Sequence, residues 1–514
     1  MTYLPKPNGS ISIHNNRGFL CPSILNFNFQ PMSLKAKTVK TLKWSTIDRL
    51  SSQLIYAAVG VVLANELSKE DFGLVGALTI FQAFALIFVD SGFGAALLQK
   101  KNPEERDYST VFWFNLIVSA GIYLILFFCA PLIADIFHDH RLEKMSRVMF
   151  LAFVVNGLGI IQTNRLTKQM HMRPVAIANI IGLLVSGGLG IGMALGGFGA
   201  WALVWQTLSL AIVKTLILWF TGHWWPRLFF SRATFRDVRR VGGSVLSSSV
   251  LNTACLQVYN FVIGAFYSLP LLGVYTQADK WSKMGSASIS QIMMSSFVPL
   301  LSGVQDTKEA FVRYMKRINR FTAFMVFPFM LWLTAAGEPI FHFLFGNKWD
   351  EAIPLFQILM VRGIFLVLTA QYNNFLLAKG KARAIFLMEA VKDVMTVAAL
   401  FSTVWTFSLE WLVWGQLAAS FITWIFSVEL TRRSLAVSAS DLLLDLFPFF
   451  GASFVMCICC IAIGWIEVSP VVRLLVEFGV GAAVYLLILG LRGVDELKEV
   501  IALCRRHLPG KKIV

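Results

Sequence analysis

The sequence contains few charged residues. They make up 14% of its 514 residues, whereas hydrophobic side chains make up 56% and the mean hydropathy is +0.67. A soluble globular domain carries about 25% charged residues, so this composition excludes that class. Among the charges, 45 Lys and Arg outnumber 29 Asp and Glu, and the basic residues lie in short loops between apolar runs. Loops of that kind set membrane orientation, so we predict a polytopic membrane protein with no nucleic-acid partner.

Motifs of catalysis and of metal binding are also missing. The sequence has no GxSxG, no GxxxxGK[ST] and no HExxH. The cysteines suggest no disulfide framework, and the group Cys457, Cys459 and Cys460 has no histidine or acidic residue beside it, so it is expected to pack as small apolar side chains. His138 and His140 lack the further ligands that a metal site needs. We therefore predict a protein that is not an enzyme and that uses no metal and no cofactor.

Long apolar runs fill most of the chain. A transmembrane helix needs about 20 apolar residues, and about fourteen such candidate spans lie between residues 44 and 491. Lys and Arg gather in every second loop, for example at 35–43, 100–106, 227–240 and 379–383. Because basic loops stay on the cytoplasmic side, this alternation supports the number of spans and predicts that both termini are cytoplasmic.

The two halves of the chain resemble each other. The turn LSKEDFGLV around Gly73 recurs as YSLPLLGVY around Gly273, and Gln206 in GAWALVWQ recurs as Gln416 in LEWLVWGQ. A nearly constant offset across six spans predicts a duplication in parallel topology. The expected fold is an all-α polytopic membrane protein with about fourteen transmembrane helices: two six-helix lobes in parallel repeat, plus two appended C-terminal helices.

The two repeated lobes and the segments before, between and after them give six expected parts of the chain. Residues 1–33 are polar and without periodicity, and Met32 opens a basic lead-in to the first span, so this stretch is expected to be disordered or a non-native extension. The expected parts are 1–33, this extension; 34–220, the N-lobe with spans 1 to 6; 221–240, a basic cytoplasmic linker; 241–433, the C-lobe with spans 7 to 12; 434–492, the appended spans 13 and 14; and 493–514, a basic cytoplasmic tail.

Several ionisable residues lie inside the predicted spans, where an ionisable group is a functional candidate by default. Arg49, Lys280 and Arg362 are predicted to form a basic lining for an anionic substrate. The polar residues of the first span share one arc of the helix, as do those of the span around Lys280. These helix faces and the seventh span add further substrate-binding candidates, which are Gln53, Asn252 and Lys283.

The acidic residues of the spans are candidates for counter-charges or ion-coupling groups. They are Asp48, Asp90 and Asp279. Asp48 and Asp279 could instead simply neutralise their neighbours and stabilise helix contacts. Asp90 is followed by Gly92 and Gly94, where helices can approach closely, and a structural role is the simpler interpretation for it.

The motifs of the chain resemble those of one family. They are LKWSTIDRLSSQ, LSKEDFGLVGALTIFQ, FVDSGFGAALLQKK, STVFWFNL, NRLTKQMHMRP, GFGAWALVWQ and VIGAFYSLPLLGVYTQADK. Together they resemble the polysaccharide transporter family, the Wzx-type lipopolysaccharide and exopolysaccharide flippases of the multidrug/oligosaccharidyl-lipid/polysaccharide exporter superfamily. The chain departs from the family where many members carry Asn-x-Asp in the seventh span, because it has Gln257, Val258 and Tyr259 there.

The resemblance implies a function. It implies two lobes around a central cavity, and alternating access that moves an undecaprenyl-diphosphate-linked oligosaccharide repeat unit across the bacterial cytoplasmic (inner) membrane. The implied partners are this lipid-linked oligosaccharide, membrane lipids, and, as candidates, a polysaccharide polymerase and other export machinery. A diphosphate carries about two negative charges, and an inside-negative potential favours its outward movement by about 2.3 kcal/mol per charge and 100 mV.

Two other function classes fit the sequence less well. A drug or small-molecule:cation antiporter of the same superfamily would need an acidic, aromatic cavity, against which the candidate cations Arg49, Lys280 and Arg362 argue. A membrane enzyme such as a polysaccharide polymerase or an acyltransferase usually has a large extracytoplasmic loop or a catalytic cluster. The predicted outer loops are all short, so the sequence favours a transporter.

Overall fold

The computed structural model describes residues 34–90, 94, 97, 100, 103–302, 304, 307–466 and 468–498. This part of the chain is helical and contains no strand. The expectation for residues 1–33 lies outside the described residues. Many large apolar side chains are exposed, including Leu54, Phe128 and Leu491. Exposed apolar surface of this extent suits helices that face lipid, because the bilayer core is as apolar as the side chains themselves.

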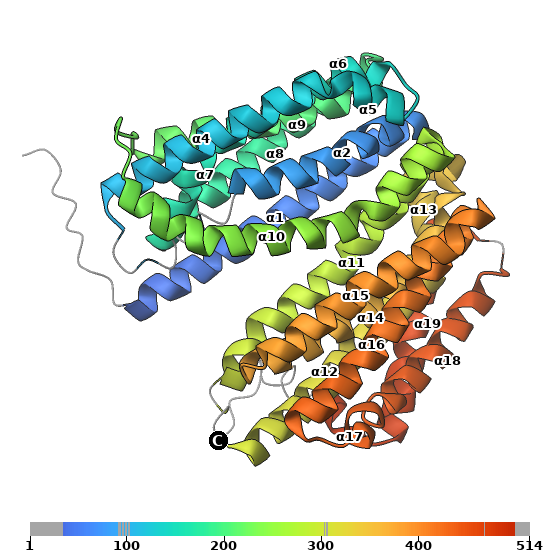
Figure 1. Cartoon of the computed structure of the whole chain (residues 1–514). Helices are drawn as coiled ribbons and strands as arrows, with labels where there is room; N and C mark the ends of the chain where they lie inside the picture. Colours follow the sequence, from blue (N-terminus) through green and yellow to red (C-terminus); the bar gives the residue numbers. More distant parts are fainter. Residues whose placement is uncertain are drawn as a thin grey trace, which may run out of the picture.

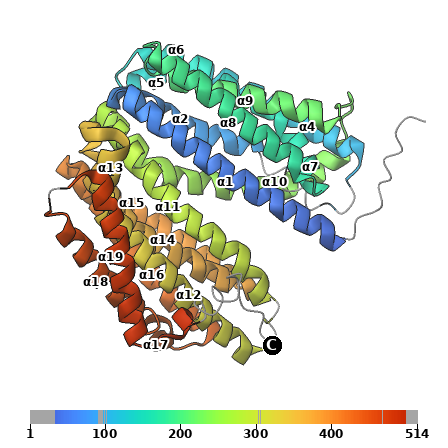
Figure 2. The same cartoon turned by 180° about the vertical axis from the view of Figure 1, so that it is seen from behind.

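The helices gather in two bundles, which Figures 1 and 2 show from opposite sides. The first bundle contains α1 (Leu34–Glu66), α2 (Lys69–Asp90), α4 (Glu105–Phe128), α5 (Ala130–Ile136), α6 (Arg141–Met149), α7 (Leu151–Lys168), α8 (Met172–Leu195) and α9 (Trp201–Gly222). The second contains α11 (Leu269–Ser302), α12 (Lys308–Ala335), α13 (Gly337–Phe345), η2 (Gly346–Trp349), α14 (Ala352–Ala378), α15 (Ala382–Thr403), η3 (Val404–Thr406), α16 (Leu409–Leu435), α17 (Ala439–Leu443), α18 (Phe447–Ile463) and α19 (Pro470–Leu491).

The bundles are inclined to each other like the arms of a V (Figure 1). They come together where α1 ends and where α2 and α11 begin, which we call the converging end. They separate toward the start of α1, which we call the diverging end. The largest cluster of buried apolar side chains continues through the contact between the arms, from Leu78 of α2 to Leu272 of α11. Close van der Waals packing of these side chains helps to hold the arms together, because lipid gives helices no hydrophobic driving force to associate.

Helix α10 (Arg232–Val262), with the short π-helix η1 (Ile263–Tyr267), lies between the bundles. Near its start, the ring of Phe235 lies 5.1 Å from the ring of Phe114 on α4. Near its end, the hydroxyl of Tyr259 donates a hydrogen bond of 3.0 Å to the carbonyl of Thr396 on α15. Near the same end, the ring of Phe261 lies 6.0 Å from the ring of Phe137, which follows α5, so the end of α10 contacts both bundles.

The two last helices pack on the outside of the second bundle. Tyr485 of α19 donates a hydrogen bond of 2.8 Å to the carbonyl of Phe324 on α12. Arg473 of α19 reaches Glu338 on α13 at 3.1 Å and Glu477 on its own helix at 2.8 Å. These contacts anchor α18 and α19 to α12 and α13, away from the inner faces of the V.

The prediction of an all-α polytopic membrane protein is confirmed. Eleven helices in the described part of the chain are long and apolar enough to cross a membrane, and α18 is a shorter apolar helix. Helices α11 and α15 are also long, but each carries at least three charged side chains, among them Asp279, Lys280 and Lys283 on α11 and Glu389 on α15. The number of fourteen spans and the division of the chain at 221–240 stay predictions.

Candidate functional site

The backbones of α2 and α11 touch at the converging end. A Cβ atom added to Gly73 would lie 1.8 Å from the carbonyl oxygen of Leu269, and one added to Gly273 would lie 1.9 Å from the carbonyl oxygen of Lys69. Only glycine permits so close an approach, since real Cβ contacts are never that short. The two glycines that mark the repeated turn in the sequence thus face each other's helix in a reciprocal contact.

A second set of contacts at the converging end joins α1 to the α13–η2 segment. Trp349 donates from Nε1 to the carbonyl of Ala64 at 2.9 Å, Lys348 donates to the carbonyl of Asn65 at 2.6 Å, and Asn65 donates to the carbonyl of Leu344 at 2.8 Å. Burial lowers the pKa of Lys348 below its usual range. These bonds satisfy the last carbonyls of α1, which have no partner within the helix, and they hold the arms together.

A cavity of about 320 Å³ lies between the arms. Its walls come from α1, α2, α8, α9 and α11, and they include Tyr56, Thr79, Gln206 and Lys280. The Nζ atom of Lys280 lies 4.6 Å from the centre of the Tyr56 ring, and a Cβ on Gly60 would come within 2.8 Å of it. No carboxylate pairs with Lys280 among the residues that the structure describes. We call this space the central cavity.

A second cavity, of about 280 Å³, lies between α10 and the helices of the second bundle and contains charges of both signs. Lys283 pairs with Asp279 at 2.6 Å, and Lys392 pairs with Glu389. The remaining charged residues of this wall are Arg362 and Asp393. The three cations are therefore balanced by three carboxylates, so this cavity has little net attraction for an anion.

Arg362 is also held by a neutral partner. Its Nε atom donates a hydrogen bond of 3.2 Å to the hydroxyl of Ser420 on α16. Asn252 of α10 lies at the edge of this cluster, where its side-chain oxygen accepts a hydrogen bond of 3.4 Å from Lys392.

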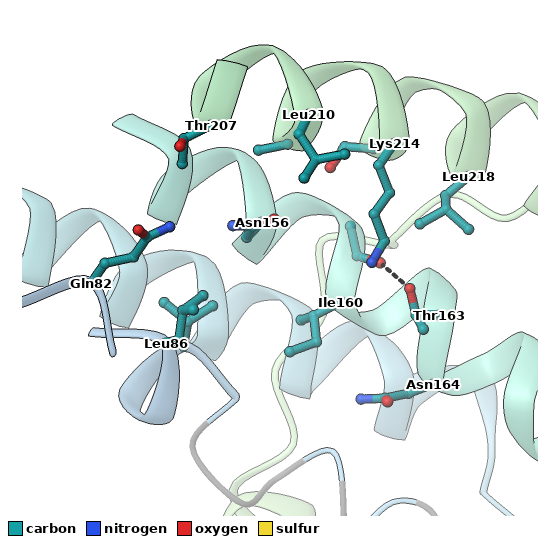
Figure 3. A pocket seen from close by; sticks show the side chains of 14 residues that line it. Gln82, Leu86, Asn156, Ile160, Thr163, Asn164, Thr207, Leu210, Lys214 and Leu218 are labelled. Atoms are coloured by element: carbon teal, nitrogen blue, oxygen red, sulfur yellow. Dashed lines mark hydrogen bonds between the residues drawn. The ribbon is translucent and has the colours of Figure 1, made fainter. Parts of the chain in front are cut away.

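A third cavity lies inside the first bundle and is the largest of the three, with about 540 Å³. Its walls come from α2, α7 and α9, and Figure 3 shows its side chains. Lys214 of α9 extends into it, and polar walls come from Gln82, Asn156, Thr163 and Asn164. This lysine is not among the candidates predicted from the sequence, although a lone cation in the apolar run AIVKTLILW meets the same criterion as Lys280.

The structure separates the three cations that the sequence grouped together. Lys280 lines the central cavity and Arg362 lines the cavity of the second bundle, whereas Arg49 is exposed on α1 and lines none of the three. Asp279 pairs with Lys283 and not with its neighbour Lys280, because consecutive residues of a helix point about 100° apart and residues four apart share a face.

The other sequence candidates lie around these cavities. Both carboxylate oxygens of Asp48 accept hydrogen bonds of 3.1 Å from the side-chain amide of Asn179 on α8, and Ser52 donates to it at 3.4 Å. Gln53 lines none of the three cavities. Asp90 is the last residue of α2, and its side chain lies outside the described part of the structure. No group of three metal-ligating side chains occurs within the described residues.

The sequence profile of a family described as "Polysaccharide biosynthesis protein" matches residues 62–354, which is more than half of the chain. The chain belongs to this family. The matched segment runs from the end of α1 to the start of α14, so it contains the contact between the glycines, the cavity of the first bundle and all of the central cavity's wall except Tyr56 and Gly60. The resemblance noted from the sequence motifs is thereby confirmed.

Curated relatives of this family member match along most of their length. It is 24% identical to the teichuronic acid biosynthesis protein TuaB of Bacillus subtilis, over 89% of this chain and 96% of the relative. It is 22% identical to the lipopolysaccharide biosynthesis protein WzxC of Escherichia coli, over 82% of this chain and 84% of the relative.

Solved structures show the same fold. The lipid II flippase MurJ in an inward closed conformation superposes with a TM-score of 0.71 at 13% identity, covering 87% of this chain and 98% of MurJ. A multidrug resistance transporter of the MATE family of the MOP superfamily, in an inward-facing conformation, superposes less well, with a TM-score of 0.58 at 15% identity and coverage of 75% and 95%. The polysaccharide biosynthesis family member therefore has the fold of the MOP superfamily.

Proposed function

We propose that this protein is a flippase for surface polysaccharide biosynthesis. It moves undecaprenyl-diphosphate-linked oligosaccharide repeat units across the bacterial cytoplasmic membrane by alternating access, and it does not change them covalently. The proposal is supported by the family membership, by relatives named for teichuronic acid and lipopolysaccharide biosynthesis, and by the likeness to a lipid II flippase. The observation that carries it is the unpaired Lys280 in the cavity between the arms.

Lys280 suits a diphosphate for electrostatic reasons. A cation removed from water and without a carboxylate partner is costly, so it attracts an anion that enters the same space. The rings of Tyr56 and Trp281 lie 4.6 and 5.5 Å from its ammonium group and stabilise the charge until the anion arrives. Hydroxyl and amide groups of the wall, such as those of Thr79 and Gln206, suit sugar hydroxyls.

The orientation of the protein follows from its basic loops. The loops rich in Lys and Arg connect the helices at the diverging end, and such loops lie on the cytoplasmic side. Both termini are then cytoplasmic, and the V opens toward the cytoplasm. In this state a lipid-linked substrate reaches the central cavity from the cytoplasmic leaflet, and opening of the contacts around Gly73 and Trp349 releases it on the other side.

The remaining charged residues have subordinate roles in this proposal. Arg49, exposed on α1 toward the diverging end, makes the first contact with the diphosphate, with Gln53 one turn further along the helix. The balanced cluster of Asp279, Lys283 and Arg362, with Asn252 at its edge, exchanges partners when the arms move. Asp48 and Asp90 serve as counter-charges of the first bundle. A polysaccharide polymerase and other export machinery receive the product.

The test is a deletion in the organism that makes the protein. Loss of the protein is expected to cause polyprenyl-diphosphate oligosaccharides to accumulate in the cytoplasmic leaflet and to stop surface glycan export. Lys280→Met should fail to restore export at normal membrane levels, whereas Lys381→Met, which removes an exposed lysine at the start of α15, should restore it. Unchanged lipid intermediates together with altered drug tolerance would instead identify a drug antiporter.

A further inference from the structure

The cavity inside the first bundle is not needed to explain the binding of a diphosphate at Lys280. It is nevertheless the largest of the three cavities and contains a cation, Lys214. Gln82, Thr207 and Leu210 line both this cavity and the central cavity, so the two spaces adjoin. A ligand that occupies the central cavity can therefore extend into the first bundle.

Lys214 has no partner of its own. It forms no ion pair and no hydrogen bond within the part of the chain that the structure describes. Asp48 is the acidic residue that acts on it electrostatically. However, the carboxylate of Asp48 is already bound by Asn179, at 3.1 Å to both oxygens, and by Ser52. The ammonium group of Lys214 therefore faces a cavity without a close counter-charge.

The walls around Lys214 offer further hydrogen-bonding groups. The side-chain nitrogen of Asn164 is buried and has no hydrogen-bond acceptor among the residues that the structure describes. The hydroxyls of Thr163, Thr207 and Thr215 donate to backbone carbonyls of Gly159, Leu203 and Val155, at 3.3, 2.9 and 3.1 Å. Their hydrogens are thus engaged and their oxygens are free to accept. In Figure 3 the amide side chains of Gln82, Asn156 and Asn164 surround the same space.

This combination matches one chemical class. A cation and a free amide N–H bind a carboxylate, the hydroxyl oxygens accept from sugar hydroxyls, and the side chains of Leu86, Ile160 and Leu218 can cover the apolar face of a sugar ring. The proposed function assigns the diphosphate to Lys280, so the cation Lys214 is left for a second anionic group of the same substrate, such as the carboxylate of a uronate.

We propose that the cavity of the first bundle binds a carboxylate-bearing sugar of the transported glycan, with Lys214 and Asn164 as the carboxylate ligands. The proposal rests on the proposed function, because it assigns the diphosphate of the same substrate to Lys280. A carboxylate site of this kind implies that the transported repeat unit contains an acidic sugar. The sugar nearest the lipid then lies beside Gln82 and Thr207, at the place where the two cavities meet.

A purely structural role for Lys214 would require close partners that the lysine stabilises. A structural lysine gains its stabilisation from partners, and Lys214 has none at close range in the described structure. Replacing an unpaired buried charge with methionine of similar length removes a desolvation cost, so the fold of Lys214→Met should be at least as stable as that of the unchanged protein. Loss of binding in this variant therefore reports on the ligand and not on unfolding.

The experiment uses the full-length protein in lipid nanodiscs and two synthetic probes. Both are polyprenyl-diphosphate disaccharides; one ends in glucuronic acid and the other in glucuronamide, which has nearly the same shape without the charge. The unchanged protein should bind the acid about tenfold more tightly than the amide, which corresponds to about 1.4 kcal/mol. Lys214→Met should bind both equally, Lys214→Arg should keep the preference, and Lys280→Met should weaken both to the same extent.

The outcomes separate the two proposals. If the unchanged protein does not distinguish acid from amide, or if Lys214→Met keeps the preference, the acidic-sugar site is wrong while the flippase assignment stands. Equal weakening of both probes in Lys214→Met also overturns the site, because it would place the diphosphate at Lys214. If neither probe binds the unchanged protein, the proposed function fails, and the acidic-sugar site fails with it.

Discussion

Gly73 and Gly273 lie against each other's helices at the converging end of the V. Each stands where any side chain would collide with a carbonyl oxygen of the other helix, Leu269 for Gly73 and Lys69 for Gly273. Two elements about 200 residues apart in the sequence thus meet through the same turn. The contact joins the arms at one end and leaves the other end free to separate.

We predict that alanine at either glycine disrupts this contact. A Cβ atom 1.8 Å from a carbonyl oxygen forces the two backbones apart, and overpacking of this kind costs about 1–3 kcal/mol. Gly73→Ala and Gly273→Ala should lower the thermal unfolding temperature of the purified protein and reduce glycan export. Gly121→Ala is the matched control, because nothing lies within 4 Å of a Cβ there. Equal stability of all three variants would contradict the reciprocal contact.

The hydrogen bond from Trp349 to Ala64 is predicted to favour the state in which the arms touch. Trp349→Phe keeps an aromatic ring beside Phe72, whose ring centre lies 5.5 Å away, but removes the donor. Loss of one buried hydrogen bond costs about 1 kcal/mol, so the separated state should become about fivefold more populated. Spin labels at the exposed Glu66 and Asn347 would report this as a longer distance. Trp465→Phe, at a residue 84% exposed, should leave the distances unchanged.

The interaction between Asp279 and Lys283 is predicted to contribute little to the stability of the folded protein. The side chain of Asp279 is 12% exposed but that of Lys283 is 57% exposed, so the lysine can turn toward water when its partner is lost. A double-mutant cycle with Asp279→Asn and Lys283→Gln should give a coupling of no more than about 1 kcal/mol in unfolding experiments. A coupling several times larger would show that the cluster around Arg362 acts as one rigid unit.

The carboxylate of Asp139, at the converging end, should make the stability of the fold decrease at acid pH. The hydrogen bonds from Arg141, at 2.6 and 3.1 Å, lower the pKa of Asp139 below its usual value. A carboxyl group whose pKa is lower in the folded state stabilises that state above the unfolded pKa of about 4, and this stabilisation is lost as the pH falls through the folded value. Asp139→Asn should therefore lower the unfolding temperature at pH 7, with a difference that shrinks below about pH 4.

The control for this pH dependence is Asp135→Asn, because Asp135 is exposed and its carboxylate forms no ion pair in the described structure. That variant should behave like the unchanged protein at both pH values. An Asp139→Asn difference that stays constant down to pH 3 would show that the ion pair with Arg141 does not stabilise the fold.

Much of the fold could be read from the sequence because it depends on local patterns. The apolar runs predict the helices, since a helix in a membrane must be apolar over about 20 residues. The repeated turn around Gly73 and Gly273 pointed to two related halves, and the motifs around it identified the family. Helical phase placed Asp279, Lys280 and Lys283 on one arc; the ion pair of Asp279 and Lys283 agrees with this, whereas Lys280 lines another cavity.

The candidate site could be predicted only in part. Helical phase tells which residues share a face of one helix, but it does not tell which neighbouring helix that face meets. Lys280 and Arg362 were therefore grouped in one lining, although they line different cavities, and Lys214 was overlooked. The pairs Asp279–Lys283 and Glu389–Lys392 form within single helices, but the packing of the helices decides which cavity each pair lines.

The sequence by itself thus determined that the chain is a polytopic membrane protein of the polysaccharide biosynthesis family, because hydropathy, loop charge and short motifs are local properties. Only the tertiary structure decided which cations are free to bind an anion. The cavity that Arg362 lines also holds three carboxylates, whereas none lies at ion-pair distance from Lys280 or Lys214 within the described residues. The electrostatic character of each cavity is a property of several helices at once, and no single stretch of sequence contains it.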